Sequence, residues 1–69
     1  MNIKSIFVKD LGYFHALEIV PKDTFGEQYF SKIYTDYGDD GCLCFFCENY
    51  SGKIVKQINK NFVIEINFY

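Results

Sequence analysis

The stretch that decides the fold of this chain is Thr24–Tyr37, with the sequence T-F-G-E-Q-Y-F-S-K-I-Y-T-D-Y. Its large apolar side chains recur at intervals of one, three or four residues, which keeps them on one stripe of an α-helix. Thr24 followed by Glu27 has the form of a capping box, and Gly38 can adopt the left-handed conformation that ends a helix. The stretch therefore predicts one amphipathic helix; its apolar residues are Phe25, Tyr29, Phe30, Ile33, Tyr34 and Tyr37.

The rest of the chain is typical of strands separated by turns. Apolar and β-branched runs alternate with short segments rich in Gly, Asp and Asn, which favour turns. We therefore expect one α+β domain over residues 1–69, with a single helix packed on a mainly antiparallel sheet in the order ββαβββ. The predicted strands are Ile3–Lys9, Tyr13–Val20, Cys42–Glu48, Lys53–Ile58 and Phe62–Phe68.

The chain is rich in apolar side chains for its length. Of its 69 residues, 49% are hydrophobic and 20% are aromatic, which excludes a disordered chain and exceeds what so small a core can cover. The strand Cys42–Glu48 is apolar on both faces. In the last strand, the residues expected to face inward are Phe62, Ile64, Ile66 and Phe68. We expect a homodimer, formed through a sheet face or an unpaired strand edge.

The charge balance argues against a nucleic-acid-binding protein. Seven lysines and no arginine stand against nine carboxylates, for a formal charge of −2. Arg is the residue best suited to bidentate contacts with phosphate and guanine. The alternative that stays open is a nucleic-acid-binding module whose aromatic rings stack on bases from an open sheet face. Its candidate residues are Phe14, Phe45 and Tyr69.

The sequence has no candidate membrane segment. No apolar run approaches the roughly 18 residues of a transmembrane helix, and Met1-Asn2-Ile3-Lys4 leads into a predicted strand instead of a signal-peptide apolar region. We therefore expect a cytoplasmic protein. The abundance of Ile, Asn, Lys, Phe and Tyr without Arg or Trp is typical of an AT-rich coding sequence, which indicates a low-GC bacterium or its phage.

Tyr37-Gly38-Asp39-Asp40 matches the tetrapeptide that holds magnesium in many RNA-dependent polymerases. In those enzymes the tetrapeptide lies on a hairpin of a domain several times larger than this chain. Because Gly38 is predicted to end a helix, we interpret the tetrapeptide as a solvated loop between a helix and a strand.

The candidate metal or thiol site consists of Cys42, Cys44 and Cys47, with His15 as a fourth ligand. Structural zinc requires four ligands in a tetrahedron, but in a strand Cys47 points to the face opposite Cys42 and Cys44. Buried thiols that pack as small hydrophobic side chains explain the run better, and a metal- or thiol-dependent protein stays an alternative. Because no catalytic set is evident, we expect no enzyme activity and no cofactor.

Carboxylates gather around the predicted end of the helix, where they oppose the helix macrodipole. Tyrosines lie beside them in the sequence, and Tyr side chains are frequent energetic centres of protein interfaces. The expected partner-binding residues are Asp36, Tyr37, Asp39, Asp40, Glu48 and Tyr50.

These observations favour a small non-enzymatic protein that binds a larger protein or nucleoprotein complex. The acidic loop would meet Lys and Arg side chains that normally hold nucleic acid, and nearby aromatic rings would add buried area. Small inhibitors that phages and mobile elements direct against host defence, anti-CRISPR proteins among them, are similar in size and general character. The hypothesis is therefore an inhibitor that acts by steric occlusion of a basic surface, with direct nucleic-acid binding not expected.

Overall fold

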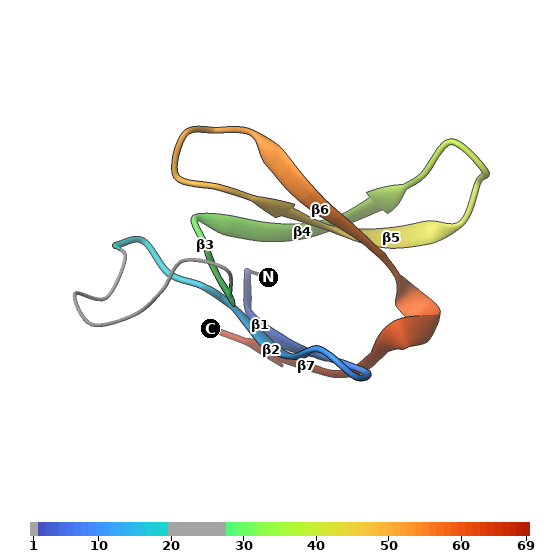
Figure 1. The fold of residues 1–69 in the computed structure, drawn as a ribbon, viewed down its shortest axis with the longest axis horizontal. Coiled ribbons are helices and arrows are strands. Elements are labelled where there is room, and N and C mark those ends of the chain that lie inside the picture. The colour runs from blue at the N-terminus through green and yellow to red at the C-terminus, as the bar shows by residue number, and fades with distance from the viewer. Residues whose placement is uncertain (1, 20–27) are drawn as a thin grey trace.

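The structure, a computed structural model, describes residues 2–19 and 28–69. These residues form seven strands and one short 3₁₀-helix, arranged in two layers (Figure 1). The elements in chain order are β1 (Ile3–Val8), β2 (Gly12–Ala16), β3 (Tyr29–Phe30), β4 (Lys32–Tyr37), β5 (Leu43–Glu48), β6 (Ile54–Asn59), η2 (Lys60–Phe62) and β7 (Val63–Phe68).

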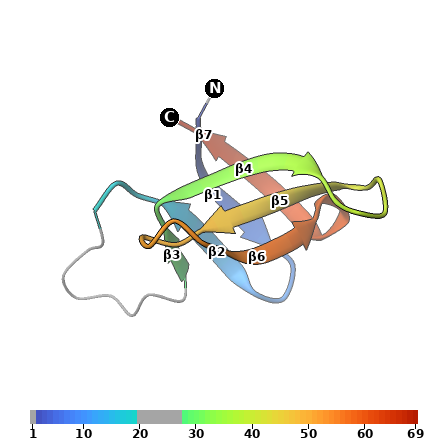
Figure 2. The same cartoon turned by 90° about the horizontal axis from the view of Figure 1, so that it is seen from above.

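The seven strands form two sheets that pack face to face. The four-stranded sheet has the order β3-β2-β1-β7, and the three-stranded sheet has the order β4-β5-β6. All neighbouring strands are antiparallel except β2 and β3, which are parallel. Seen from above, the strands of one sheet cross those of the other (Figure 2). The chain passes between the sheets twice, from β3 to β4 and, through η2, from β6 to β7.

The predicted helix over Thr24–Tyr37 is wrong, and so is the α+β fold class with the order ββαβββ. Residues 24–27 lie outside the described part of the chain. Tyr29–Phe30 and Lys32–Tyr37 are strands, and the described residues contain no helix longer than η2. The composition of β4 supplies a physical reason, because Ile33, Tyr34 and Thr35 are β-branched or aromatic residues that favour a pleated surface.

The helix-like spacing has its origin in the change of sheet at Ser31. Phe30 and Ile33 are three residues apart and both are buried in the core, although a straight strand would place them on opposite faces. Between them, the Ser31 backbone N–H donates to Glu48 O at 2.9 Å, and the Ser31 hydroxyl lies 3.1 Å from Glu48 O and 2.9 Å from Asn49 O. The chain therefore leaves one sheet and enters the other at Ser31, which resets the alternation and turns both side chains into one core.

Each of the five predicted strands overlaps an observed strand. They correspond to β1, β2, β5, β6 and β7, although β2 ends at Ala16 and the predicted end at Val20 lies outside the described residues. The turn between β1 and β2 contains Asp10 and Gly12 at φ values of 68° and 90°. Glycine, and to a lesser degree Asp, adopts this conformation at low cost.

The core lies between the two sheets and takes residues from both. Phe45 and Cys47 of the central strand β5 face Ile6 and Phe14 of the four-stranded sheet across it. Because β5 lies between β4 and β6, its edges are already paired and cannot mediate the expected homodimer. The complete cluster is Ile3, Ile6, Val8, Phe14, Ala16, Phe30, Ile33, Phe45, Cys47 and Ile58.

The prediction that Phe62, Ile64, Ile66 and Phe68 face inward holds only for Ile66 and Phe68, which pair with the core residues Ile6 and Ile3 and so share their face. All four side chains are nevertheless exposed. Val63 is instead the β7 residue that packs against the core. A register shift in the β1–β7 pairing between Phe7 and Val8 adds one residue to β7 and displaces the alternation there. In addition, β7 is an edge strand, so its inner face is only partly covered.

Alanine substitutions distinguish this arrangement from the helix that the spacing suggests. On a helix, Ile33 and Tyr37 would share the buried stripe, whereas here Ile33 is buried and the Tyr37 side chain is 69% exposed. We expect Ile33→Ala to lower the free energy of unfolding by about 2–5 kcal/mol. Tyr37→Ala should change it by about 0.5 kcal/mol or less. Urea denaturation of the two variants measures both values, and comparable large losses would contradict the strand arrangement.

Candidate functional site

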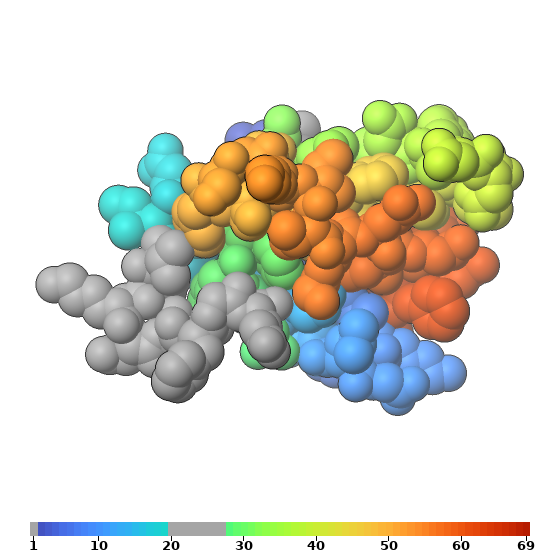
Figure 3. Space-filling model, turned by 45° about the horizontal axis from the view of Figure 1, so that its top comes forward, coloured from blue at the N-terminus to red at the C-terminus, as the bar shows by residue number. Residues whose placement is uncertain are grey.

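The structure separates the six predicted partner-binding residues into two groups. Asp36 and Tyr37 end β4, and Asp39 and Asp40 lie in the turn that follows. The other two residues, Glu48 and Tyr50, lie at the far end of β5 and in the β5–β6 turn. The two turns project from opposite ends of the three-stranded sheet (Figures 1 and 3). The six residues therefore do not form one surface, and we name Asp36–Asp40 the acidic turn.

The acidic turn is held by hydrogen bonds within itself and to the two residues that follow it, Gly41 and Cys42. The Gly38 N–H donates to Cys42 O at 2.8 Å, and the Gly41 N–H donates to Gly38 O at 2.9 Å. Side chains add to these bonds: Asp40 Oδ1 accepts from the Cys42 N–H at 3.1 Å, and Asp36 Oδ1 accepts from the Tyr37 N–H at 2.7 Å. A turn fixed in this way loses little conformational entropy on binding, which favours its use as a contact surface.

Tyr37 is the most prominent side chain of the acidic turn. Its side chain is 69% exposed and forms one wall of a depression of about 350 Å³ between the turn and η2. Cys42 and Lys60 also line this depression. An exposed tyrosine between carboxylates can supply buried area and a hydroxyl to a partner, while the carboxylates bind Lys or Arg.

Glu48 and Tyr50 serve the contact between the sheets. The Tyr50 hydroxyl donates to Leu17 O at 2.8 Å and so ties the β5–β6 turn to the segment after β2. The pKa of Tyr50 is raised, mainly because the ring is partly desolvated and also because of Tyr69. Glu48 is half-buried and supplies its backbone oxygen to Ser31. A structural role accounts for the position of both residues.

The three cysteines do not converge with His15. Cys47 lies in the core, whereas the Cys44 Sγ lies 3.5 Å from both Cys42 O and Gln57 Nε2, and Cys42 is exposed. His15 belongs to the four-stranded sheet. Among the described residues, no group of three or more His, Cys, Asp or Glu side chains could hold a metal ion.

The cysteine pKa values are also unfavourable for thiol chemistry. Burial raises the pKa of the Cys47 thiol to about 12, so this thiol stays protonated. The charge of Asp40 raises the pKa of the exposed Cys42 thiol. A nucleophilic cysteine requires the opposite shift, because the thiolate is the reactive form.

The residues expected to stack on nucleic-acid bases are not available for that role. Phe14 and Phe45 are each only 3% exposed and belong to the core. Tyr69 is exposed, and its hydroxyl donates to Ala16 O. The prediction of an aromatic platform made of these three residues is therefore wrong.

A different row of aromatic rings lies on the outer face of the four-stranded sheet. The ring centroids of Phe7 and Tyr13 are 4.7 Å apart, those of Tyr13 and His15 5.9 Å, and those of His15 and Tyr29 5.3 Å. The rings pack on one another along the row, and Tyr13 is 41% exposed. In the sequence, the row could have been recognised from the alternation of side chains along β1 and β2, which places Phe7, Tyr13 and His15 on the outer face.

A carboxylate stands at one end of the aromatic row. Glu65 accepts hydrogen bonds from the Tyr13 hydroxyl at 3.0 Å and from Asn67 Nδ2 at 2.9 Å. Both hydrogen bonds lower the pKa of Glu65, the bond from Asn67 more than the bond from Tyr13, so the Glu65 carboxylate stays charged. A fixed negative charge beside the rings repels phosphate groups, so this face is poorly suited to nucleic acid.

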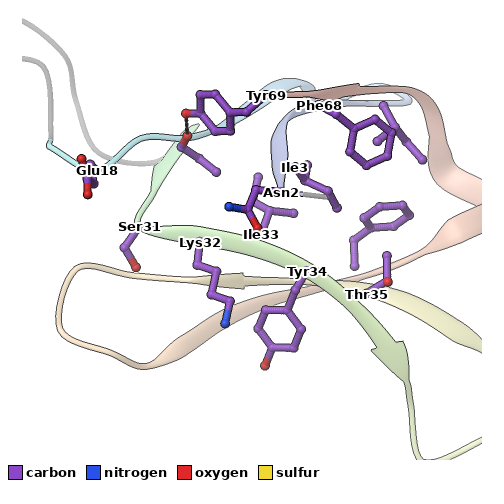
Figure 4. A pocket seen from close by; sticks show the side chains of 13 residues that line it. Asn2, Ile3, Glu18, Ser31, Lys32, Ile33, Tyr34, Thr35, Phe68 and Tyr69 are labelled. Atoms are coloured by element: carbon purple, nitrogen blue, oxygen red, sulfur yellow. Dashed lines mark hydrogen bonds between the residues drawn. The ribbon is translucent and has the colours of Figure 1, made fainter.

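An apolar groove of about 710 Å³ opens between the two sheets, on the side where β4 and β7 form their edges (Figure 4). Ile33 and Phe45 from one sheet and Ile3, Ile66 and Phe68 from the other line it. Glu18 and Lys32 lie on its rim. Sequence reasoning missed the groove because it depends on which strands are edges.

No protein-family model, curated protein or solved structure matches this chain. None of the helices in the part of the chain that the structure describes is long and apolar enough to cross a membrane.

The reactivity of Cys42 reports on the geometry of the acidic turn. Because the Asp40 charge raises the Cys42 pKa, Asp40→Asn should lower that pKa and increase the thiolate fraction at a given pH. The Asn oxygen can still accept the Cys42 N–H, so the turn is preserved. We expect one rapidly reacting thiol in the native wild-type chain and a faster reaction in Asp40→Asn.

Reaction with a chromogenic disulfide between pH 7 and 10 measures this effect. Asp10→Asn, a change of the same kind on the β1–β2 turn, is the control and should leave the rate unchanged. Equal rates for Asp40→Asn and wild type at every pH would contradict the described turn.

Proposed function

We propose that this chain is a small non-enzymatic protein that binds a larger protein, with the acidic turn as its main contact. The observation that carries the proposal is a rigid turn that exposes Tyr37 between carboxylates. Tyrosines in such positions are frequent hot spots of protein interfaces.

The chemistry of the acidic turn indicates the kind of surface it would cover. The turn between β4 and β5 projects at one end of the molecule (Figure 1). The carboxylates of Asp36, Asp39 and Asp40 belong to this turn and complement a surface rich in Lys and Arg. A protein that covers such a surface blocks the access of nucleic acid to it. We therefore propose steric inhibition of a nucleoprotein complex in the cytoplasm, of the kind that phage inhibitors of host defence carry out.

Charge reversal at the acidic turn tests this proposal. Asp39 is exposed, and the hydrogen bonds of the turn use Asp36 and Asp40 instead, so Asp39→Lys should leave the fold intact. Affinity capture from lysates of low-GC bacteria with the tagged chain should recover a stoichiometric partner. Asp39→Lys and Tyr37→Ala should each weaken binding of the purified partner by about tenfold or more, a cost of about 1.4 kcal/mol.

The matched control is Glu18→Lys, which makes the same change in charge at an exposed residue after β2, outside the acidic turn. It should bind like wild type at moderate salt. Equal binding by wild type, Asp39→Lys and Tyr37→Ala would show that the partner uses another surface. Loss of binding in all variants, Glu18→Lys included, would point to net charge instead of the acidic turn.

A further inference from the structure

Among the described edge strands of six residues, β7 is the one that carries no Lys. The four edge strands are β3, β4, β6 and β7. Natural proteins protect such edges with short strands, bulges or Lys side chains. β3 has two residues, β4 carries Lys32 and β6 carries Lys56, while β6 and β7 both have register shifts in the pairing with their neighbours. The six residues of β7 carry a single charge, Glu65, which is engaged on the outer face by Tyr13 and Asn67.

The apolar residues of β7 are exposed together. The exposed fractions of Ile64, Ile66 and Phe68 are 66%, 42% and 48%. Apolar residues that lie next to one another on an accessible edge are typical of an interaction surface. Ile66 and Phe68 also line the groove between the sheets, so the exposed edge and the groove form one continuous apolar region.

The backbone of β7 is available for pairing along this edge. The Tyr69 N–H donates to Asn2 O at 3.0 Å and so points toward β1. Because the directions of backbone groups alternate along a strand, the N–H and C=O groups of Phe68 and Ile66 point away from β1. These groups can form the hydrogen bonds of an added antiparallel strand.

We propose that β7 pairs with β7 of a second copy of this chain, antiparallel and centred on Ile66. In this register Ile66 faces the second copy's Ile66, and Phe68 faces its Ile64. Glu65 faces the second copy's Asn67, so a carboxylate meets an amide. Centring the pair on Glu65 would instead place two carboxylates directly opposite each other, which is unfavourable. The β7 sequence is thus complementary to itself in the register centred on Ile66, and this complementarity favours a second copy as the occupant of the edge.

The pairing joins two four-stranded sheets into one continuous sheet across a two-fold axis. The axis is perpendicular to the sheet, so both three-stranded sheets lie on the same side of it. The acidic turn belongs to the three-stranded sheet and is not part of the pairing. The dimer therefore presents two acidic turns, and its existence does not depend on the proposed function.

Lysine substitutions on two edges test the pairing. Ile64→Lys and Ile54→Lys place the same charge on β7 and β6, at side chains that are 66% and 52% exposed, so neither change should unfold the chain. Light scattering at high micromolar concentration should give a dimer for wild type and Ile54→Lys. Ile64→Lys should raise the dissociation constant by about tenfold or more. A monomeric wild type, or a loss of dimer in Ile54→Lys and not in Ile64→Lys, overturns the proposal.

Single cysteine substitutions in β7 test the register of the proposed β7–β7 pairing. In a Cys42→Ser background, which removes the exposed native thiol, Ile66→Cys places two thiols opposite each other at a separation that a disulfide can span. Under mild oxidation it should form a covalent dimer roughly tenfold or more faster than Glu65→Cys or Asn67→Cys, because only residue 66 meets its own copy. Faster cross-linking through residue 65 or 67, or equal rates at all three positions, overturns the register centred on Ile66.

Discussion

The arrangement of this protein depends on the change of sheet at Ser31. The hydrogen bonds of Ser31 to Glu48 fix the point at which the chain leaves β3 and becomes β4. One continuous segment therefore belongs to both sheets, and Phe30 and Ile33 on either side of the break enter the same core. Because β4 pairs with β5 from this point onward, the crossover also sets the register of the hairpin that ends in the acidic turn.

The same crossover explains why one side of the molecule is closed and another is open. The sheets are joined at the β3–β4 corner and through η2 at the β6–β7 corner. At the remaining side, β4 and β7 are edges of different sheets, and the groove lies between them. In a chain of 69 residues the core is too small to cover every apolar side chain, and the uncovered ones include Ile64, Ile66 and Phe68 of β7.

Local sequence patterns predicted the five strands, but the features that depend on non-local strand pairing could not be predicted from the sequence. The runs that became β1, β5, β6 and β7 contain enough β-branched and aromatic residues to be recognised without tertiary information. If the chain is assumed to stay in one element, the three-residue spacing of Phe30 and Ile33 indicates a helix. The residues next to Ser31 in the sequence do not reveal that the chain changes sheet there. The exposure of Ile66 depends on the strand order, which the sequence does not specify.

The candidate site, like the fold, could be predicted from the sequence only in part. Asp36, Tyr37, Asp39 and Asp40 are adjacent in the sequence, so they stay together in either a helical or a stranded fold. Glu48 and Tyr50 were grouped with them by sequence distance, but β5 places a strand length between them and the acidic turn, about 17–20 Å for a typical strand. The groove and the β7 edge have no local signature, because both arise from two sheets ending beside each other.

The most direct test of this account is the backbone conformation of Tyr29–Tyr37, measured from the ¹³Cα and ¹³Cβ chemical shifts of the labelled protein. The two-sheet arrangement predicts strand-type shifts for Tyr29–Phe30 and again for Lys32–Tyr37, with a break at Ser31. Uninterrupted helix-type shifts across these residues would contradict it, because a helix there could neither pair with β5 nor join the two sheets.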